Sequence, residues 1–314
     1  MDERVIDLPY LLRYALVHGV ILNTRPPKTS KAYQKIWWSE GSPLIVISRW
    51  LTEKVQRKVS VPVVLAMRYG NPSIANALKE LHSKGVDEVL LIPLYPQYAM
   101  ATTETIEVLT EKLIKASYPN MRLTKFPAFF YRPEYIEALA QVVRAHLGTA
   151  PFDHLLFSYH GVPERHLYKT TPTSAHKHIV EGVTCCDPYS EEGRHCYRSH
   201  CFETTRLLAE KLGLEKGKYS QAFQSRLGKD KWITPFTSDK IIELARNGVK
   251  KLAVIAPAFV ADCVETLEEI EIVGGKSFRK NGGENFKMIP CLNDSDLWVQ
   301  ALSSWINEET RDER

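Results

Sequence analysis

The stretch that decides the fold is Leu78-Lys-Glu-Leu-His-Ser-Lys-Gly-Val-Asp-Glu-Val-Leu-Leu-Ile92, because its pattern returns as Ile241-Ile-Glu-Leu-Ala-Arg-Asn-Gly-Val-Lys-Lys-Leu-Ala-Val-Ile255. The two copies are offset by 163 residues (241 − 78). Each reads as an amphipathic helix, a glycine that caps it and a buried strand. One explanation of the repeat is that any helix–glycine–strand unit has a similar pattern. The explanation that we favour is that the chain forms two similar Rossmann-like halves with a cleft between them.

Short apolar runs alternate with amphipathic stretches along the rest of the chain. Strands are predicted at 63–67, 88–94, 155–157, 218–223 and 252–255, and helices at 73–84, 103–116, 134–146, 204–212 and 239–247. This alternation indicates an α/β fold with parallel sheets flanked by helices. We place an N-terminal half at 1–148 and a C-terminal half at 149–314. The second half carries a cysteine-rich insertion at about 181–202 and ends in a helix that packs back on the first half.

Composition narrows the class of protein. The net charge of +4 is too small to indicate nucleic-acid binding, but it suits an anionic small molecule or a loose contact with a membrane surface. No apolar run reaches the ~18 residues that a membrane span needs. The chain begins Met-Asp-Glu-Arg, unlike a signal peptide, so we expect a cytoplasmic protein. No glycine-rich nucleotide-binding fingerprint occurs.

Ligands of such sheets bind beyond the carboxyl ends of the strands. His160 stands at one of these ends, directly before Gly161, where a neutral imidazole could accept a proton or bind a metal. Glu265 and Glu269 follow another strand end at a spacing that puts both on one helix face. Such a pair could escort a divalent cation or relay protons, although surface helices also carry solvated glutamate pairs.

The run Leu155-Leu-Phe-Ser-Tyr-His-Gly-Val-Pro-Glu-Arg165 resembles the signature segment of the ferrochelatases, enzymes that insert ferrous iron into a porphyrin. Further matches lie on both sides of it, in the order in which the family has them, from residue 25 to residue 270. They are Arg25-Pro-Pro-Lys28 with Tyr33, Gly41-Ser-Pro43, Pro93-Leu-Tyr-Pro-Gln-Tyr98, Phe223-Gln-Ser-Arg226, Trp232 with Pro235 and Thr237, and Phe259-Val-Ala-Asp-Cys-Val-Glu-Thr-Leu-Glu-Glu-Ile270.

The resemblance implies a porphyrin cleft between two Rossmann-like halves, with Fe²⁺ and protoporphyrin IX as substrates. It makes His160 the pocket histidine that takes pyrrole protons or holds the metal, with Glu265 opposite it. Asp262 and Glu269 would continue an acidic path for iron. The porphyrin-binding residues that it implies are Arg25, Tyr33, Tyr95, Ser225, Trp232 and Phe259.

The sequence departs from the family at two places. The family normally opens with a strand, a Gly-Thr-Pro turn and a helix. These elements are missing before the segment that starts here at Arg4. Without that strand, which is usually central, we expect the sheet of the first half to be damaged. The second departure is Cys263, where some relatives carry histidine and others cysteine.

Four of the six cysteines form a cluster with the spacing Cys-Cys-x9-Cys-x4-Cys: Cys185, Cys186, Cys196 and Cys201. Zinc sites usually take paired cysteines two to four residues apart, so the adjacent pair is awkward for zinc. Four thiolates suit a [2Fe–2S] cluster, and some bacterial ferrochelatases resemble this chain in carrying one on an internal segment. Zinc and unligated thiols remain the alternatives. His195 or His200 could replace a thiolate, although both read more simply as loop histidines.

Three other functions compete with protoporphyrin ferrochelatase. A ferrochelatase acting on coproporphyrin III, which carries four carboxylates, belongs to the same class. An iron–sulfur electron-transfer or sensor protein would use the cysteines alone and make His160 and Glu265 dispensable. A zinc module that binds nucleic acid needs a basic patch interleaved with aromatic residues, and the sequence has no such patch. No feature of the sequence sets the number of subunits.

Overall fold

A computed structural model describes residues 2–171, 189, 193–226 and 230–310 of the chain. The helices and strands alternate along it as an α/β fold requires. In chain order they are α1 (Tyr10–Ala15), η1 (Leu16–Ile21), α2 (Leu22–Gln34), α3 (Pro43–Gln56), α4 (Ile74–Ser83), β1 (Glu88–Leu91), η2 (Met100–Glu104), α5 (Thr105–Ser117), β2 (Arg122–Lys125), α6 (Pro133–Leu147), β3 (His154–His160), α7 (Glu164–Thr170), α8 (Tyr197–Leu212), β4 (Tyr219–Gln224), α9 (Thr237–Arg246), β5 (Lys251–Ile255), η5 (Glu265–Gly274), α10 (Gly275–Lys280), β6 (Asn285–Met288) and α11 (Asp296–Glu309).

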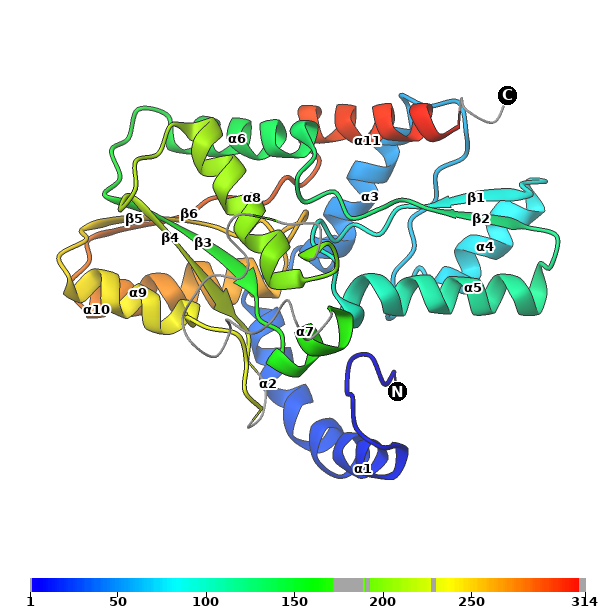
Figure 1. The fold of residues 1–314 in the computed structure, drawn as a ribbon, viewed down its shortest axis with the longest axis horizontal. Coiled ribbons are helices and arrows are strands. Elements are labelled where there is room, and N and C mark those ends of the chain that lie inside the picture. The colour runs from blue at the N-terminus through cyan, green and yellow to red at the C-terminus, as the bar shows by residue number, and fades with distance from the viewer. Residues whose placement is uncertain (1, 172–188, 190–192, 227–229, 311–314) are drawn as a thin grey trace.

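Two parallel sheets organise the molecule. The strands β1 and β2 form one, and the other has the order β4-β3-β5-β6. Helices α6 and α11 run along one side of both sheets, while α9 and α10 cover the opposite face of the larger sheet (Figure 1). The predicted α/β fold with parallel sheets flanked by helices is therefore confirmed.

The central strand β3 feeds two hydrophobic cores. Leu155, Phe157 and Tyr159 pack in the core that contains α6 and α11, and Leu156 packs in the core of α9 and α10. All four side chains are fully buried. Because successive side chains of a strand point to opposite faces, a strand buried on both faces reads as the continuous apolar run seen here.

The repeat around Gly85 and Gly248 is confirmed in three dimensions. Each glycine follows a helix at positive φ, +76° and +88° respectively. The amide that follows each glycine donates to the equivalent carbonyl, Val86 to Leu81 and Val249 to Leu244. Both helices therefore end in the same Schellman motif, which turns the chain into β1 in one half and β5 in the other.

The strand predictions were wrong at three places. Residues 63–66 form no ladder within the described chain, and only Met67 makes a bridge, to Ser73. The strands β2 and β6 were missed because each lies at a sheet edge and carries charged residues, which edge strands use against unwanted pairing. Among the helices, α8 begins seven residues before the predicted start (204 − 197), which brings Cys201 into its first turns.

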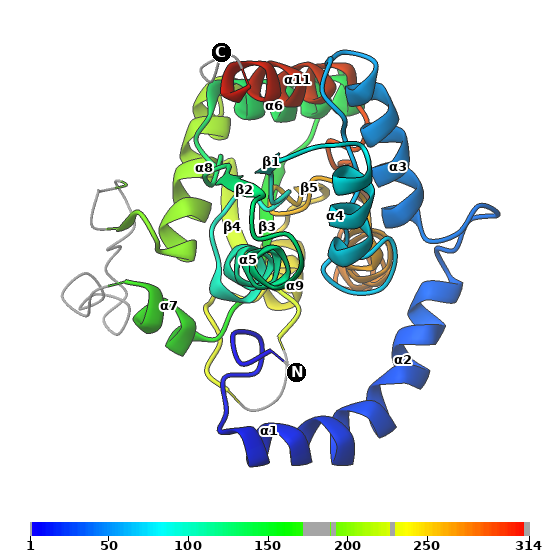
Figure 2. The same ribbon diagram turned by 90° about the vertical axis from the view of Figure 1, so that its right-hand side faces the viewer.

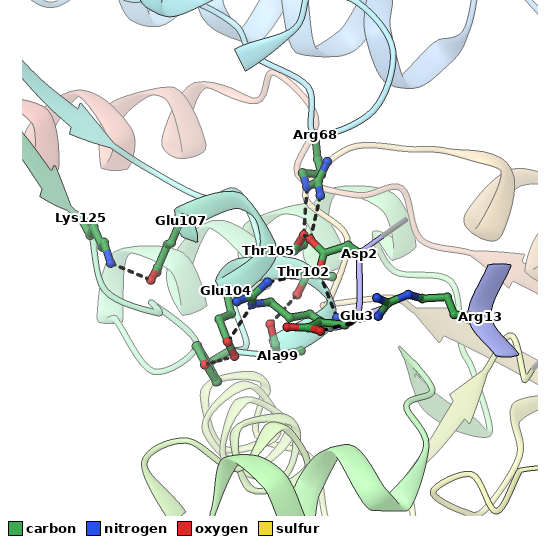
Figure 3. Close-up of polar contacts among 12 residues, drawn as sticks. Asp2, Glu3, Arg13, Arg68, Ala99, Thr102, Glu104, Thr105, Glu107 and Lys125 are labelled. Carbon is green, nitrogen blue, oxygen red and sulfur yellow. Dashed lines mark hydrogen bonds and ion pairs between the residues drawn. The ribbon is translucent and has the colours of Figure 1, made fainter. Parts of the chain in front are cut away.

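The N-terminal segment folds as an arm outside the body. Helices α1 and α2 form an arc that leaves the rest of the molecule (Figure 2). The residues before the arm are held by polar contacts at the start of α5 (Figure 3). Asp2 accepts hydrogen bonds from Arg68, at 2.8 Å, and from Thr105, and these bonds lower the pKa of Asp2 to about 2 although burial opposes them. Arg4 bridges to Glu104 at 2.9 Å.

Candidate active site

His160 ends β3 at the carboxyl edge of the larger sheet, flanked by β4 and β5. Its Nδ1 lies 2.6 Å from the carbonyl oxygen of Gly161. A carbonyl oxygen can only accept, so Nδ1 carries the hydrogen, and in the neutral imidazole the lone pair is then on Nε2. The ring is therefore held in the tautomer that can take a proton or bind a metal through Nε2.

The turn after His160 leaves no room for a side chain at Gly161. A Cβ there would lie 2.8 Å from the carbonyl oxygen of Gln224 and 3.2 Å from the Trp232 ring. Trp232 is itself fixed by a bridge to Pro163. The Phe259 ring lies 6.2 Å from the His160 ring. Two of the residues predicted to bind porphyrin thus flank the predicted catalytic histidine.

Glu265 is the first residue of the π-helix η5. The side-chain amide of Gln224 donates to the backbone carbonyl of Glu265 at 3.1 Å, and Gln224 is the β4 partner of His160 in the sheet. One residue therefore links the two that were predicted to face each other. π-Helical turns are rare and often mark functional sites.

Glu269, on the same π-helix, is held by Ser225. The Ser225 amide donates to one carboxylate oxygen at 3.0 Å and the hydroxyl to the other at 2.5 Å. Ser225 adopts the left-handed conformation, with φ of 63°, which is uncommon for any residue other than glycine. The strained backbone directs both donors of Ser225 at the same carboxylate.

Asp262 is 6% exposed, and its carboxylate is directed into the protein. It accepts hydrogen bonds from the Cys291 amide at 3.2 Å, the Thr266 hydroxyl at 3.0 Å and the Asn293 amide at 2.7 Å. Thr266 belongs to the first turn of η5, so Asp262 anchors the start of the helix that presents Glu265.

Together with burial, the charge of Glu265 contributes to the pKa shifts of two tyrosines, Tyr33 and Tyr95. Burial, and then the charge of Glu265, raises the pKa of Tyr33. Burial also raises the pKa of Tyr95, with further contributions from Tyr69 and Glu265. The Cys263 thiol lies in the same cluster, and burial together with Glu265 raises its pKa well above the ordinary value, so it stays protonated. The charge of Glu265 therefore acts on residues of both α2 and the segment after β1.

Arg25 lies apart from this cluster. It is exposed on α2, the helix that carries Tyr33.

The sequence analysis missed Arg68 and Tyr69. The Arg68 guanidinium lies 4.6 Å from the centre of the Tyr69 ring, which is 63% exposed. The charge of Arg68 acts against the rise in the pKa of Tyr95. Arg68 and Tyr69 directly follow the apolar run at 63–67, so their position at the end of a predicted strand is the signal that could have indicated them.

Two of the four cysteines predicted to hold a [2Fe–2S] cluster lie among the described residues. Cys196 and Cys201 are buried at the start of α8, where Cys196 is the N-cap residue. Cys185 and Cys186 lie outside the described residues. Within 2–171, 189, 193–226 and 230–310, no three His, Cys, Asp or Glu residues are arranged to hold a metal ion. That observation leaves the four-cysteine prediction untested.

His200, one of the alternative ligands, has both ring nitrogens engaged. The Tyr98 amide donates to Nδ1 at 3.1 Å, and Nε2 lies 2.9 Å from the Arg194 carbonyl, to which it must donate. Its ring stacks on Phe130 at 3.7 Å. Burial lowers the pKa of His200 to about 3. The residue is a neutral link between the cysteine segment and the first half, with no lone pair for a metal.

Comparison with known proteins gives a consistent result. The ferrochelatase family model matches residues 1–310. Curated ferrochelatases of Pseudomonas syringae pv. tomato and Pseudomonas aeruginosa are 45% and 47% identical, each over 304 residues that cover 96% of this chain and 88% of the relative. Among solved structures, SirB from Bacillus subtilis with Fe³⁺ matches with a TM-score of 0.57 at 12% identity, covering 85% of this chain and 91% of SirB. At that identity the likeness shows the fold alone.

We expect His200→Phe to change both stability and its pH dependence. Phenylalanine keeps the stacking on Phe130 but leaves the Tyr98 amide and the Arg194 carbonyl unpaired, at a cost of about 1–3 kcal/mol for each group. In the native protein the pKa of His200 is about 3, below its ordinary 6.5. Between these two pH values His200 is protonated in the unfolded chain but not in the folded chain. The wild type should therefore lose stability as the pH falls from 6.5 towards 3.

Urea unfolding at pH 7.5 and pH 5 measures this effect. The variant should be less stable at pH 7.5 and lose less of its stability at pH 5. The difference in slope between the two proteins reports the contribution of His200. Equal pH dependence in the two proteins would contradict the assignment.

Proposed function

The chain belongs to the ferrochelatase family, and from that premise we propose that its porphyrin is protoporphyrin IX and that Fe²⁺ enters it between His160 and Glu265. As a member of that family it is a metal chelatase, a lyase that inserts Fe²⁺ into a porphyrin for haem synthesis. The observation that carries the residue proposal is the Nε2 lone pair of His160 at the sheet edge, joined to Glu265 through Gln224.

The chemistry explains the demand for a base. A free porphyrin has two pyrrole N–H groups, and both protons must leave before iron can bind all four nitrogens. With Nδ1–H bonded to the Gly161 carbonyl, Nε2 is the nitrogen through which a neutral His160 ring would accept such a proton. A base held in one orientation loses no reorganisation energy when the proton arrives.

We propose that iron approaches along the acidic residues of η5. Glu265 would receive the metal opposite His160, and Glu269 would hold it one step earlier, with its carboxylate oriented by Ser225. Carboxylate oxygens suit a hydrated divalent cation. Asp262 stands behind them in the same series. Its three hydrogen bonds support a role in holding the start of η5.

The porphyrin plane needs apolar walls and a cationic partner for its propionates. Phe259 and Trp232 beside His160 provide flat apolar surface, and Tyr33 and Tyr95 would close the other side from the first half. Arg25, exposed on the arm, could pair with a propionate once the substrate is bound. Protoporphyrin IX has two carboxylates and therefore needs fewer cationic partners than coproporphyrin III, which has four.

We expect His160→Ala to lose haem formation at least about 100-fold, the scale of general-base catalysis, because the proposed acceptor of the pyrrole proton is removed. The assay adds Fe²⁺ and protoporphyrin IX anaerobically and follows haem absorbance. His154→Ala is the matched control, since it removes a histidine from the opposite end of the same strand. Coproporphyrin III in a parallel assay tests the substrate. Turnover surviving in His160→Ala would contradict the role of His160, and faster turnover of coproporphyrin III would contradict the choice of porphyrin.

We propose separately that Cys185, Cys186, Cys196 and Cys201 hold a [2Fe–2S] cluster. The two described members support it. Both are buried, and Cys196 caps the N-terminus of α8, where the helix dipole favours a thiolate. The engagement of both His200 nitrogens disfavours His200 as a ligand in place of a cysteine. A cluster there would supply a redox-active iron centre outside the porphyrin pocket. The family match over residues 1–310 disfavours an electron-transfer protein that uses the cysteines alone.

We expect Cys196→Ser to remove the visible absorbance and the acid-labile sulfide of protein purified without oxygen, because four thiolates are the usual ligand set. Cys291→Ser is the matched control, since Cys291 is as buried but lies outside the segment. A colourless wild type that carries zinc would overturn the cluster assignment. So would an unchanged spectrum in Cys196→Ser.

We also propose that the N-terminal arm docks on an anionic lipid surface. No helix in the described part of the chain is long and apolar enough to cross a membrane. Helix α1, however, exposes Leu11 (79%) with Tyr10 and Leu12 beside it. Between residues 8 and 39 the sequence has no Asp or Glu and five Lys or Arg. Exposed apolar residues among positive charges are typical of helices that lie in the membrane interface.

Vesicle co-sedimentation tests this docking. The protein should bind phosphatidylcholine vesicles that contain phosphatidylglycerol, bind pure phosphatidylcholine weakly, and be released by salt. Leu11→Glu should weaken binding about tenfold or more, because one buried leucine contributes about 1.5–3 kcal/mol. Val273→Glu, at an exposed apolar position outside the arm, is the control. Equal loss in both variants would contradict docking through α1, as would binding that ignores lipid charge.

A further inference from the structure

Tyr197 makes a direct contact between the cysteine segment and His160. It is the first residue of α8 and follows Cys196. Its hydroxyl donates a hydrogen bond to the backbone carbonyl of His160 at 2.8 Å. The side chain is 6% exposed, and burial raises the pKa of Tyr197 well above the ordinary value, so the hydroxyl stays protonated and remains a donor.

The contact completes a clamp on one peptide group. The carbonyl of His160 and the amide of Gly161 belong to the same planar unit. Tyr197 binds the carbonyl end of that unit, and the Gly161 amide donates to the Gln224 carbonyl at 2.7 Å. The next carbonyl, that of Gly161, accepts Nδ1–H of His160. Rotation of the clamped peptide would move the group that selects the tautomer of the histidine.

We propose that Tyr197 is a positioning residue for the chelatase reaction, which holds the peptide after His160 so that Nε2 faces the porphyrin. The inference rests on the function proposed for His160. The same turn of α8 carries His200, which binds the Tyr98 amide in the loop that also bears Tyr95. The start of α8, between Cys196 and Cys201, thus holds both walls of the pocket. Any group that orders these cysteines would act on the catalytic geometry through this turn.

A neighbouring tyrosine separates positioning from simple stability. Tyr159 is also fully buried, and its hydroxyl lies 2.8 Å from the Thr205 hydroxyl on α8. It joins the same strand to the same helix but does not touch the 160–161 peptide. Tyr159→Phe and Tyr197→Phe each remove one buried hydroxyl hydrogen bond between β3 and α8, so their costs in stability should be similar.

Steady-state kinetics of the two variants with Fe²⁺ and protoporphyrin IX test the inference. Tyr197→Phe should lower kcat by about 10- to 100-fold, the effect expected of a slightly misplaced catalytic group, and leave KM for porphyrin within about twofold. Tyr159→Phe should keep the wild-type kcat. Equal kcat values in the two variants would overturn the role of Tyr197, as would a change confined to KM. Urea unfolding of both variants checks that their stabilities match.

A spectroscopic readout does not depend on turnover. Nitrogen-15 NMR of labelled histidine distinguishes the Nδ1–H tautomer from the Nε2–H tautomer, and His160→Ala assigns the signal. The wild type should show the Nδ1–H form at His160, and Tyr197→Phe a mixture of the two forms. If Tyr197→Phe keeps both the wild-type tautomer and the wild-type kcat, and His160→Ala is inactive, the positioning role of Tyr197 is overturned. Full activity in His160→Ala would instead overturn the proposed catalytic role of His160 itself.

Discussion

The hydrogen bond from His160 Nδ1 to the Gly161 carbonyl, at 2.6 Å, is the interaction on which the site depends. In the neutral ring it leaves Nε2 as the acceptor, and it exists because the chain turns sharply after β3. That turn requires glycine, since any Cβ would collide with the Gln224 carbonyl. Gln224 in turn reaches the Glu265 carbonyl, so the base and the acidic helix are positioned by one strand pair.

The two halves are joined by buried polar contacts in addition to apolar packing. His200 accepts from the Tyr98 amide, Gln97 donates to Thr204 at 3.1 Å, and the Tyr135 hydroxyl donates to the Pro257 carbonyl at 2.6 Å. Each contact connects the half that carries Tyr33 and Tyr95 to the half that carries His160. Buried hydrogen bonds are costly to break because each partner would be left unpaired away from water, so these contacts hold the segments that they join in place.

Much of the fold could be predicted from the sequence because its signals are local. The helix–glycine–strand units at Gly85 and Gly248 were predicted from apolar periodicity and a capping glycine, and both motifs form as expected. The edge strands β2 and β6 were missed because their charged residues hide the strand pattern. Residues 63–66 have strand-like composition, but a strand also needs a neighbour to pair with, and propensity alone does not supply one.

The fold class and the family could be read from the sequence alone, because strand ends and an ordered series of motifs are readable along the chain. The sequence did not determine what the residues of the site do to one another. The tautomer of His160, the inward-facing carboxylate of Asp262 and the Tyr197 contact were decided only by tertiary structure. Tyr197 and His160 are 37 residues apart, and a hydrogen bond depends on a few tenths of an ångström that only the packed fold defines.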